Sequence, residues 1–194
     1  MKKWAIGIAV FVVALTIIFG WRPTQHSEPP LTKDMPIPDI KVTSSAFPDN
    51  GIIPAQFTCD VGSPAGGMSP PIEISGLPTN TKTLALIMHD PDAPREGGWT
   101  HWVKWNMPWN MEYGTWRTEE GKEPSGVSGK GSGGTTTYQG PCPPSGTHRY
   151  FFTIYALDSE LLLKEGGTKT ELESAMNGHI LAKGELIGLY ARRQ

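Results

Sequence analysis

The chain has 194 residues, of which 17 are basic and 19 acidic, for a formal net charge of −2 at pH 7. It has no basic block that could neutralise a phosphate backbone, so the composition argues against a nucleic-acid-binding protein. Gly and Pro, with 23 and 18 residues, are too abundant for a helix bundle or a coiled coil. Cys59 and Cys142 are too few for a disulfide-dense scaffold or a four-cysteine zinc site, and they leave one disulfide open.

An uncharged segment begins close to the N-terminus. Residues 4–21 are 18 consecutive residues without a charge, and Lys2 and Lys3 precede them. As a helix, such a segment is about 27 Å long, close to the hydrocarbon thickness of a bilayer. We expect residues 1–21 to be a single-pass membrane anchor, because the preceding lysines favour a cytoplasmic N-terminus. A cleaved signal peptide and a buried helix are the alternatives, although no small-x-small cleavage site follows the segment.

The anchor and the signal peptide both predict an extracytoplasmic location for the rest of the chain. In the first case it stays at the cell membrane, and in the second it is secreted or periplasmic. Residues 22–39 contain five prolines, which favour an extended linker. Residues 40–194 remain for a single domain, which is long enough to form a hydrophobic core.

Short apolar runs separated by turns predict that this domain is mainly β. Residues 83–88 (TLALIM) are apolar almost throughout, as in a strand that is buried on both faces. Alternation in residues 99–107 predicts a strand on which Trp99, His101, Val103 and Trp105 share one face. The other expected strands cover residues 41–47, 52–58, 70–75, 148–157 and 181–191.

Near the C-terminus the pattern becomes helical. Thr168 and Glu171 form an S/T-x-x-E capping box ahead of Leu172. Many short strands with one late helix indicate an all-β sandwich with a small helical addition.

Two Pro-rich segments carry the side chains that are best suited to binding. Residues 88–94 (MHDPDAP) follow the buried strand, and their prolines end it with Asp90 and Asp92 at the sheet edge. Residues 140–150 (GPCPPSGTHRY) lead from a second Pro-rich loop into another strand, and His101 lies on the strand between the two segments. The order of these segments therefore suggests one site built from three places in the chain.

These motifs, in this order and spacing, resemble the phosphatidylethanolamine-binding protein family, and within it the prokaryotic branch also called Raf kinase inhibitor-like proteins. The resemblance covers about residues 40–192 and rests on residues 90–94 (DPDAP), 99–102 (WTHW), 140–144 (GPCPP) and 148–157 (HRYFFTIYAL). It implies a sandwich of two antiparallel β-sheets with a small pocket at one end. The family's pocket takes anions such as phosphate, phosphonate or acetate, and hence phospholipid head groups.

The resemblance also assigns the pocket residues by motif position. They are Asp90, Asp92, Pro94, His101, Pro143, Pro144, His148 and Tyr150. Carboxylates repel an anion, so we expect imidazolium groups of His101 and His148 to donate to it, with an affinity that rises as the pH falls. Arg149 alternates with His148 on its strand, and we expect it to form a structural ion pair or hydrogen bond.

The predicted function is binding without catalysis, and without a cofactor or a metal ion. The resemblance leaves inhibition of a serine protease or a kinase as the alternative, with the Gly-rich residues 121–140 as a flexible segment for the partner. A Cys142 nucleophile is disfavoured, because the neighbouring prolines lack the N–H groups that an oxyanion hole needs. In an exported domain, Cys59 and Cys142 could instead form a disulfide.

Overall fold

The computed structural model describes residues 37–61, 67–109 and 114–192. The predicted membrane anchor and residues 22–36 of the predicted linker lie outside these ranges. Within the described ranges, no helix is long and apolar enough to cross a membrane. The described residues form two β-sheets with one short α-helix near the C-terminus, which confirms the mainly β prediction.

The larger sheet has six strands in the order β2-β9-β8-β4-β5-β7. They are β2 (Gly51–Ile52), β4 (Thr83–Asp90), β5 (Trp99–Pro108), β7 (Val127–Ser128), β8 (Thr147–Leu157) and β9 (Ile180–Ala191). Neighbouring strands are antiparallel except β2 and β9, which are parallel. The expectation of purely antiparallel sheets is therefore wrong at this edge, where the paired strands are distant in the chain and no hairpin joins them.

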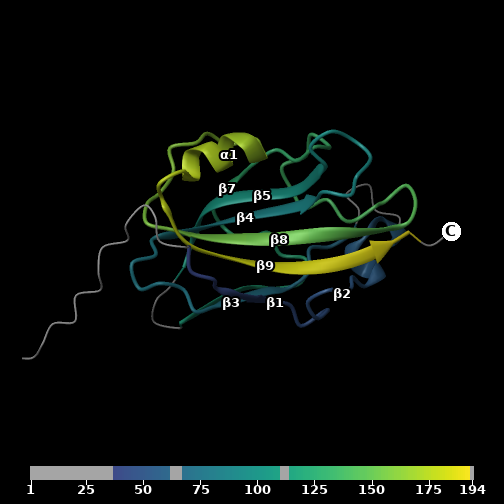
Figure 1. Ribbon diagram of the computed structural model, residues 1–194, viewed down its shortest axis with the longest axis horizontal. Helices are drawn as coiled ribbons and strands as arrows, with labels where there is room; N and C mark the ends of the chain where they lie inside the picture. Colours follow the sequence, from purple (N-terminus) through teal and green to yellow (C-terminus); the bar gives the residue numbers. More distant parts are fainter. Residues whose placement is uncertain (1–36, 62–66, 110–113, 193–194) are drawn as a thin grey trace, which may run out of the picture. The chain divides into compact units, whose positions relative to one another are not determined.

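The smaller sheet has three antiparallel strands, β1 (Lys41–Thr43), β3 (Ile72–Ser75) and β6 (Thr115–Thr118), in the order β1-β3-β6. Helix α1 (Lys169–Met176) packs on the other face of the larger sheet, which is thus the middle of three layers (Figure 1). The helix begins as predicted, because Thr168 and Glu171 form both hydrogen bonds of a capping box.

Alternation of side chains along the larger sheet divides the core into two parts. On β8, Tyr150, Phe152 and Ile154 belong to the part between the two sheets, whereas Leu157 packs with Leu172 of α1. Strand β4 contributes to both parts, because it lies between β8 and β5 and is covered on each face. This position explains its continuous apolar sequence, and it confirms the prediction of a strand buried on both faces.

A bulge in β5 changes the side-chain pattern that the sequence predicts. Opposite the step from Met88 to His89 of β4, strand β5 has one extra residue, His101. His101 lines a cavity on the inner side of the sheet, whereas Val103 and Trp105 pack in the part of the core that contains α1. The prediction that these three residues share one face is wrong, because a bulge interrupts the two-residue period of a strand.

The N-terminal strands are shorter than predicted. The strand expected over residues 41–47 ends at Thr43, and the one expected over residues 52–58 ends at Ile52. Pro54 follows, and proline lacks the N–H group that continued pairing requires. The chain instead forms two short 3₁₀ helices, η1 (Ala55–Phe57) and η2 (Cys59–Val61).

The Gly-rich residues 121–140 are not the free segment that the sequence suggests. The N–H groups of Gly129, Ser132 and Gln139 donate to carbonyl oxygens of β5 at 2.9, 2.8 and 3.2 Å. Two residues within the segment form β7, which pairs with β5. The segment therefore runs along the edge of the larger sheet and delivers Gln139 to the end of β5 where His101 lies.

Candidate functional site

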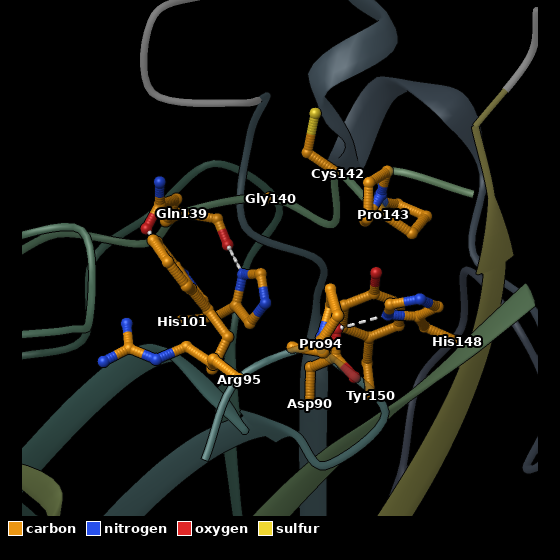
Figure 2. Close-up of a pocket in the computed structure, with 13 residues that line it drawn as sticks. Asp90, Pro94, Arg95, His101, Gln139, Gly140, Cys142, Pro143, His148 and Tyr150 are labelled. Atoms are coloured by element: carbon orange, nitrogen blue, oxygen red, sulfur yellow. Dashed lines mark hydrogen bonds and ion pairs between the residues drawn. The ribbon is translucent and has the colours of Figure 1, made fainter. Parts of the chain in front are cut away.

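A cavity of about 310 Å³ lies at the end of the larger sheet where β4 ends and β5 and β8 begin (Figure 2). The predicted pocket residues that line it are Asp90, Pro94, His101, Pro143, Pro144, His148 and Tyr150. Asp92, the eighth predicted residue, is outside this lining. The other lining residues are Ala93, Arg95, Trp99, Gln139, Gly140 and Cys142. The structure thus brings together residues from three separate segments of the chain.

Asp90 is the last residue of β4, and it is 3% exposed. One carboxylate oxygen accepts the N–H of Asp92 at 2.8 Å, and the other accepts Nδ1–H of His148 at 2.8 Å. Gly98 lies in the turn that follows, with a φ of +68°, and a Cβ atom there would clash with the carbonyl oxygen of Asp90. The two hydrogen bonds therefore hold the carboxylate in place at the cavity, and the turn that follows needs a glycine at residue 98.

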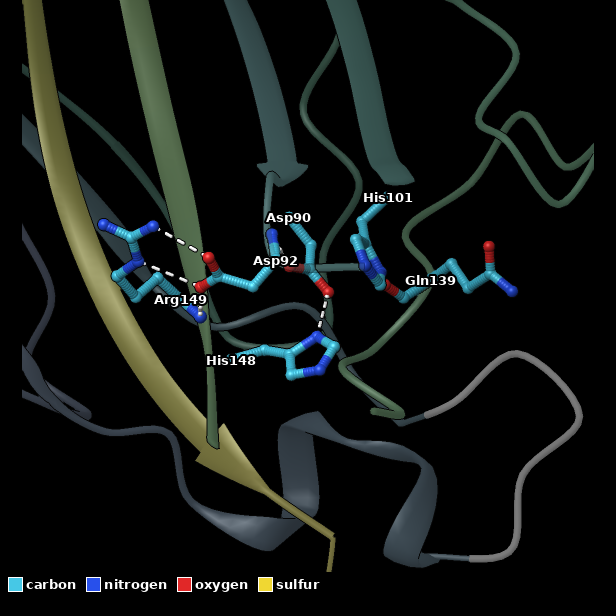
Figure 3. A network of polar contacts seen from close by, with 6 residues as sticks. All are labelled: Asp90, Asp92, His101, Gln139, His148 and Arg149. Carbon is cyan, nitrogen blue, oxygen red and sulfur yellow. Dashed lines mark hydrogen bonds and ion pairs between the residues drawn. The ribbon is translucent and has the colours of Figure 1, made fainter. Parts of the chain in front are cut away.

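Asp92 serves a different contact. Its carboxylate binds the guanidinium group of Arg149 at 2.7 and 2.9 Å and accepts the backbone N–H of Arg149 at 2.9 Å (Figure 3). The hydrogen bonds from Arg149 lower the pKa of Asp92 to about 2. Arg149 thus forms the ion pair that its alternation with His148 predicts, and Asp92 is the partner rather than a residue of the cavity lining.

His101 presents a hydrogen-bond acceptor to the cavity. Its Nδ1 lies 2.7 Å from the carbonyl oxygen of Gln139, so Nδ1 carries the proton and Nε2 of the neutral ring can only accept. Nε2 is buried and has no hydrogen-bond partner among the described residues. Burial lowers the pKa of His101 to about 4, so the ring is neutral near pH 7. The predicted imidazolium donor is therefore wrong at His101, because the buried ring is a neutral acceptor.

Tyr150 presents a donor to the same cavity. Its hydroxyl is buried and, within the described part of the chain, makes no hydrogen bond of ordinary geometry, although Asp90 is close by. Burial and the charge of Asp90 raise the pKa of the phenol, which therefore stays protonated. The rings of Tyr150 and His101 are in edge contact, with centroids 5.3 Å apart. Buried polar groups are normally paired, so the unpaired acceptor of His101, beside a hydroxyl that has only Asp90 nearby, marks a place for a ligand.

Arg95 and Gln139 belong to the lining but were not predicted from the sequence. The guanidinium carbon of Arg95 lies 5.2 Å from the centre of the Trp99 ring, and Nε1 of Trp99 donates to Oε1 of Gln139 at 3.2 Å. These contacts bring a cation to a cavity that also contains Asp90. The position of Arg95 directly after the DPDAP motif was a signal that could have identified it.

One wall of the cavity, residues 139–144, is tied to the 3₁₀ helices near the N-terminus. Cys142 forms a disulfide with Cys59 of η2, with Cα atoms 5.4 Å apart. The hydroxyl of Tyr138 donates to the carbonyl oxygen of Phe57 in η1 at 2.8 Å. The disulfide that the sequence left open is therefore present, and it holds a residue of the cavity lining.

Comparison with known proteins assigns the family. The family model described as phosphatidylethanolamine-binding protein matches residues 43–191. The chain belongs to the phosphatidylethanolamine-binding protein family. This result confirms the resemblance that the motifs of the sequence indicate.

The most similar proteins found include a UPF0098 protein from Methanothermobacter thermautotrophicus. It is 45% identical over 157 residues, which cover 79% of this chain and 99% of that protein. The crystal structure of a phosphatidylethanolamine-binding protein homologue from Chlamydia trachomatis has a TM-score of 0.72 at 39% identity, covering 80% of this chain and 99% of the other. Escherichia coli YbcL has a TM-score of 0.70 at 27% identity, with the same coverage. This member of the family therefore belongs to its prokaryotic, YbcL-like branch.

In this family member the cavity brings several polar side chains together. The described residues contain no cluster of three or more His, Cys, Asp or Glu side chains that could hold a metal ion. The Asp90–His148 pair has the geometry of a general base, but the lining contains no Ser, Thr or free thiol for it to activate. Within a small volume the site combines the acceptor of His101, the hydroxyl of Tyr150, the carboxylate of Asp90 and the guanidinium group of Arg95, with the His148 ring beside them.

Proposed function

We propose that this protein binds a small phosphate-bearing ligand, such as the free head group of a phospholipid, in the cavity at the end of β4, without catalysing a reaction. The observation that carries the proposal is the buried, unpaired acceptor of His101 in a cavity that the hydroxyl of Tyr150 also lines, close to Asp90. A phosphoryl group accepts hydrogen bonds through its oxygens and can also carry a proton.

The volume and charges of the cavity support a ligand of this size and type. A volume of about 310 Å³ is at the lower end of the range for small-molecule sites. Arg95 supplies a positive charge for an anion, and Asp90 supplies a negative charge for an ammonium group. A zwitterion such as phosphoethanolamine satisfies both.

We also propose that the protein is anchored in the membrane with this domain on the extracytoplasmic side. The uncharged residues 4–21 support an anchor, and the Cys59–Cys142 disulfide supports an oxidising compartment. Protease added to intact cells should digest the domain. A domain that stays protected until the cells are lysed would contradict this location.

Inhibition of a serine protease or a kinase is the alternative that the family resemblance implies, with the Gly-rich segment as the candidate contact with the partner. Residues 121–140 are hydrogen-bonded along β5 and contribute Gln139 and Gly140 to the cavity lining. The segment therefore has a structural role that accounts for its presence without a protein partner.

The test is calorimetric titration of the full chain, in a non-ionic detergent, with phosphoethanolamine at pH 6.5. We expect saturable binding that Tyr150→Phe weakens about tenfold or more, as expected for the loss of a hydrogen bond to a charged group. His89→Gln is the matched control, because His89 lies outside the cavity lining on the neighbouring position of β4. No binding by a well-folded wild-type protein would rule the proposal out.

A further inference from the structure

We propose that the cavity selects oxyanions that carry a proton, such as the monoanion of a phosphomonoester, over oxyanions of similar size and charge that carry none, such as sulfate monoesters and phosphodiesters. The inference rests on the proposed function and names the class of ligand within it. Its basis is the hydrogen-bond acceptor that His101 presents to the cavity.

The orientation of the His101 ring commits its two nitrogens to different roles. Nδ1 donates to the carbonyl oxygen of Gln139 at 2.7 Å, which leaves Nε2 as the nitrogen that faces the cavity lining (Figure 2). Rotating the ring would break this hydrogen bond, and the bulge in β5 holds the residue at this position. A ligand that contacts Nε2 of the neutral ring must therefore supply a hydrogen atom.

The surroundings of His101 resist the second proton that would turn Nε2 into a donor. Burial is the largest effect and lowers the pKa of His101 to about 4, and the charges of His148 and His89, when protonated, act in the same direction. Arg95 lines the same cavity and is a permanent cation. Asp90 and the carbonyl oxygen of Gln139 favour the protonated form but do not outweigh burial. The acceptor role thus persists through the neutral pH range.

A phosphomonoester matches this pair of contacts in its monoanionic form. Its P–OH group donates to Nε2 of His101, and an ionised oxygen accepts from the hydroxyl of Tyr150, whose ring is in contact with that of His101. A sulfate monoester or a phosphodiester has only acceptors, so it leaves Nε2 unpaired and places a lone pair against it. The Asp90 carboxylate adds to the preference, because it repels every monoanion but can accept a hydrogen bond from one that carries a proton.

Three monoanions of similar size test this inference: methyl phosphate, methyl sulfate and dimethyl phosphate. Each is titrated into the full chain in a non-ionic detergent at pH 5.5, where methyl phosphate is largely the monoanion because its second pKa is about 6. We expect methyl phosphate to bind about tenfold tighter or more than the other two, the size of effect that one unpaired buried acceptor causes. Its affinity should fall between pH 5.5 and 8 as the P–OH proton is lost, while methyl sulfate stays weak throughout.

Two variants separate the acceptor from the donor. His101→Gln replaces Nε2 by an amide group that can donate as well as accept. The ratio of the affinities for methyl phosphate and methyl sulfate should therefore fall towards one. Tyr150→Phe removes a donor that serves all three ligands, so all affinities should fall by a similar factor while the preference stays. His89→Gln, outside the cavity lining, should change neither.

The outcomes distinguish the inference from the proposed function. Equal binding of methyl phosphate and methyl sulfate overturns the inference and leaves the anion site intact, whereas no binding of any of the three overturns both. A methyl sulfate affinity that rises steeply as the pH falls from 8 to 5.5 would show that His101 becomes protonated with the ligand, and this too overturns it. The comparison of ligands on the wild-type protein needs no variant, so a variant that fails to fold leaves the test decisive.

Discussion

Asp90 and Asp92 are two residues apart in the same Pro-rich motif, yet they occupy opposite environments. The Asp90 side chain is 4% exposed and pairs with His148 at the cavity, whereas the Asp92 side chain is 28% exposed and pairs with Arg149. Their partners are consecutive on β8 and therefore point to opposite faces of the sheet. One motif thus places its first carboxylate at the cavity and its second at the surface.

The two histidines near this motif show the same contrast. His89 is half-buried, and its Nδ1 contacts the hydroxyl of Thr100 at 3.3 Å. His101 is almost fully buried, and its Nε2 has no partner in the described part of the chain. Residues that lie together in sequence or on paired strands therefore differ in function because of the face that they occupy.

The largest expected effect on the cavity side concerns the disulfide. Replacing Cys59 and Cys142 together by serine should lower the free energy of unfolding by about 4 kcal/mol, because the bond closes a long loop, 83 residues apart in sequence. Urea unfolding of the oxidised wild type, the reduced wild type and the double variant measures this effect. Reduced wild type should match the variant, and equal stability of all three would contradict a stabilising role.

Removal of the buried carboxylate should be almost as costly. Asp90→Ala deletes the acceptor of two hydrogen bonds and leaves His148 without its partner, so we expect a loss of about 3 kcal/mol. Denaturant unfolding at pH 7 gives the value. A loss below about 1 kcal/mol would mean that the buried Asp90 contributes no more to stability than the exposed Asp92.

The pH dependence of stability should separate the two histidines. An unfolded histidine binds a proton near pH 6.5, but folded His101 does so only near pH 4, so stability should fall by about 3 kcal/mol as the pH drops from about 6.5 to about 4. His101→Gln should remove this part of the slope. His89→Gln should remove less, because His89 is only half-buried and its pKa is lowered by a smaller burial effect. Identical slopes of stability against pH in the two variants would contradict the difference in burial effect between His101 and His89.

The smallest effect is expected for the exposed ion pair. Asp92→Ala should cost about 1 kcal/mol or less, since an exposed pair with arginine is screened by solvent. The same unfolding experiment, repeated in 1 M salt, should reduce the difference further. A loss as large as that of Asp90→Ala would show that both carboxylates are part of one structural unit.

Much of the fold could be predicted from local patterns. The buried strand β4, the aromatic strand β8 and the capping box of α1 agree with the sequence, because a continuous apolar run, a strand-like composition and a cap each depend on neighbouring residues. The strand expected after Ile52 and the uniform alternation of β5 were wrong. Pro54 is a local signal for the end of the first strand, whereas the extra residue in β5 depends on pairing with β4 and leaves no local signal.

Some residues of the candidate site could likewise be predicted from the sequence, and others could not. Motif positions were enough to gather Asp90, His101, His148 and Tyr150 at one end of the sheet. They were not enough to assign Asp92 to Arg149, because that depends on which way the turn after β4 directs each carboxylate. They also missed Arg95, whose relevance depends on the ring of Trp99 beneath its guanidinium group.

By itself, the sequence of this protein determined its family, its β-rich architecture and the set of polar residues that gather at one place, because these are encoded in composition, spacing and motif order. Only the tertiary structure decided what each of those residues presents. The carbonyl oxygen of Gln139, from a segment 38 positions away, makes His101 an acceptor, and burial keeps it neutral. The protonation state and hydrogen-bonding role of a side chain depend on its neighbours in space and on its access to water, and folding alone sets both.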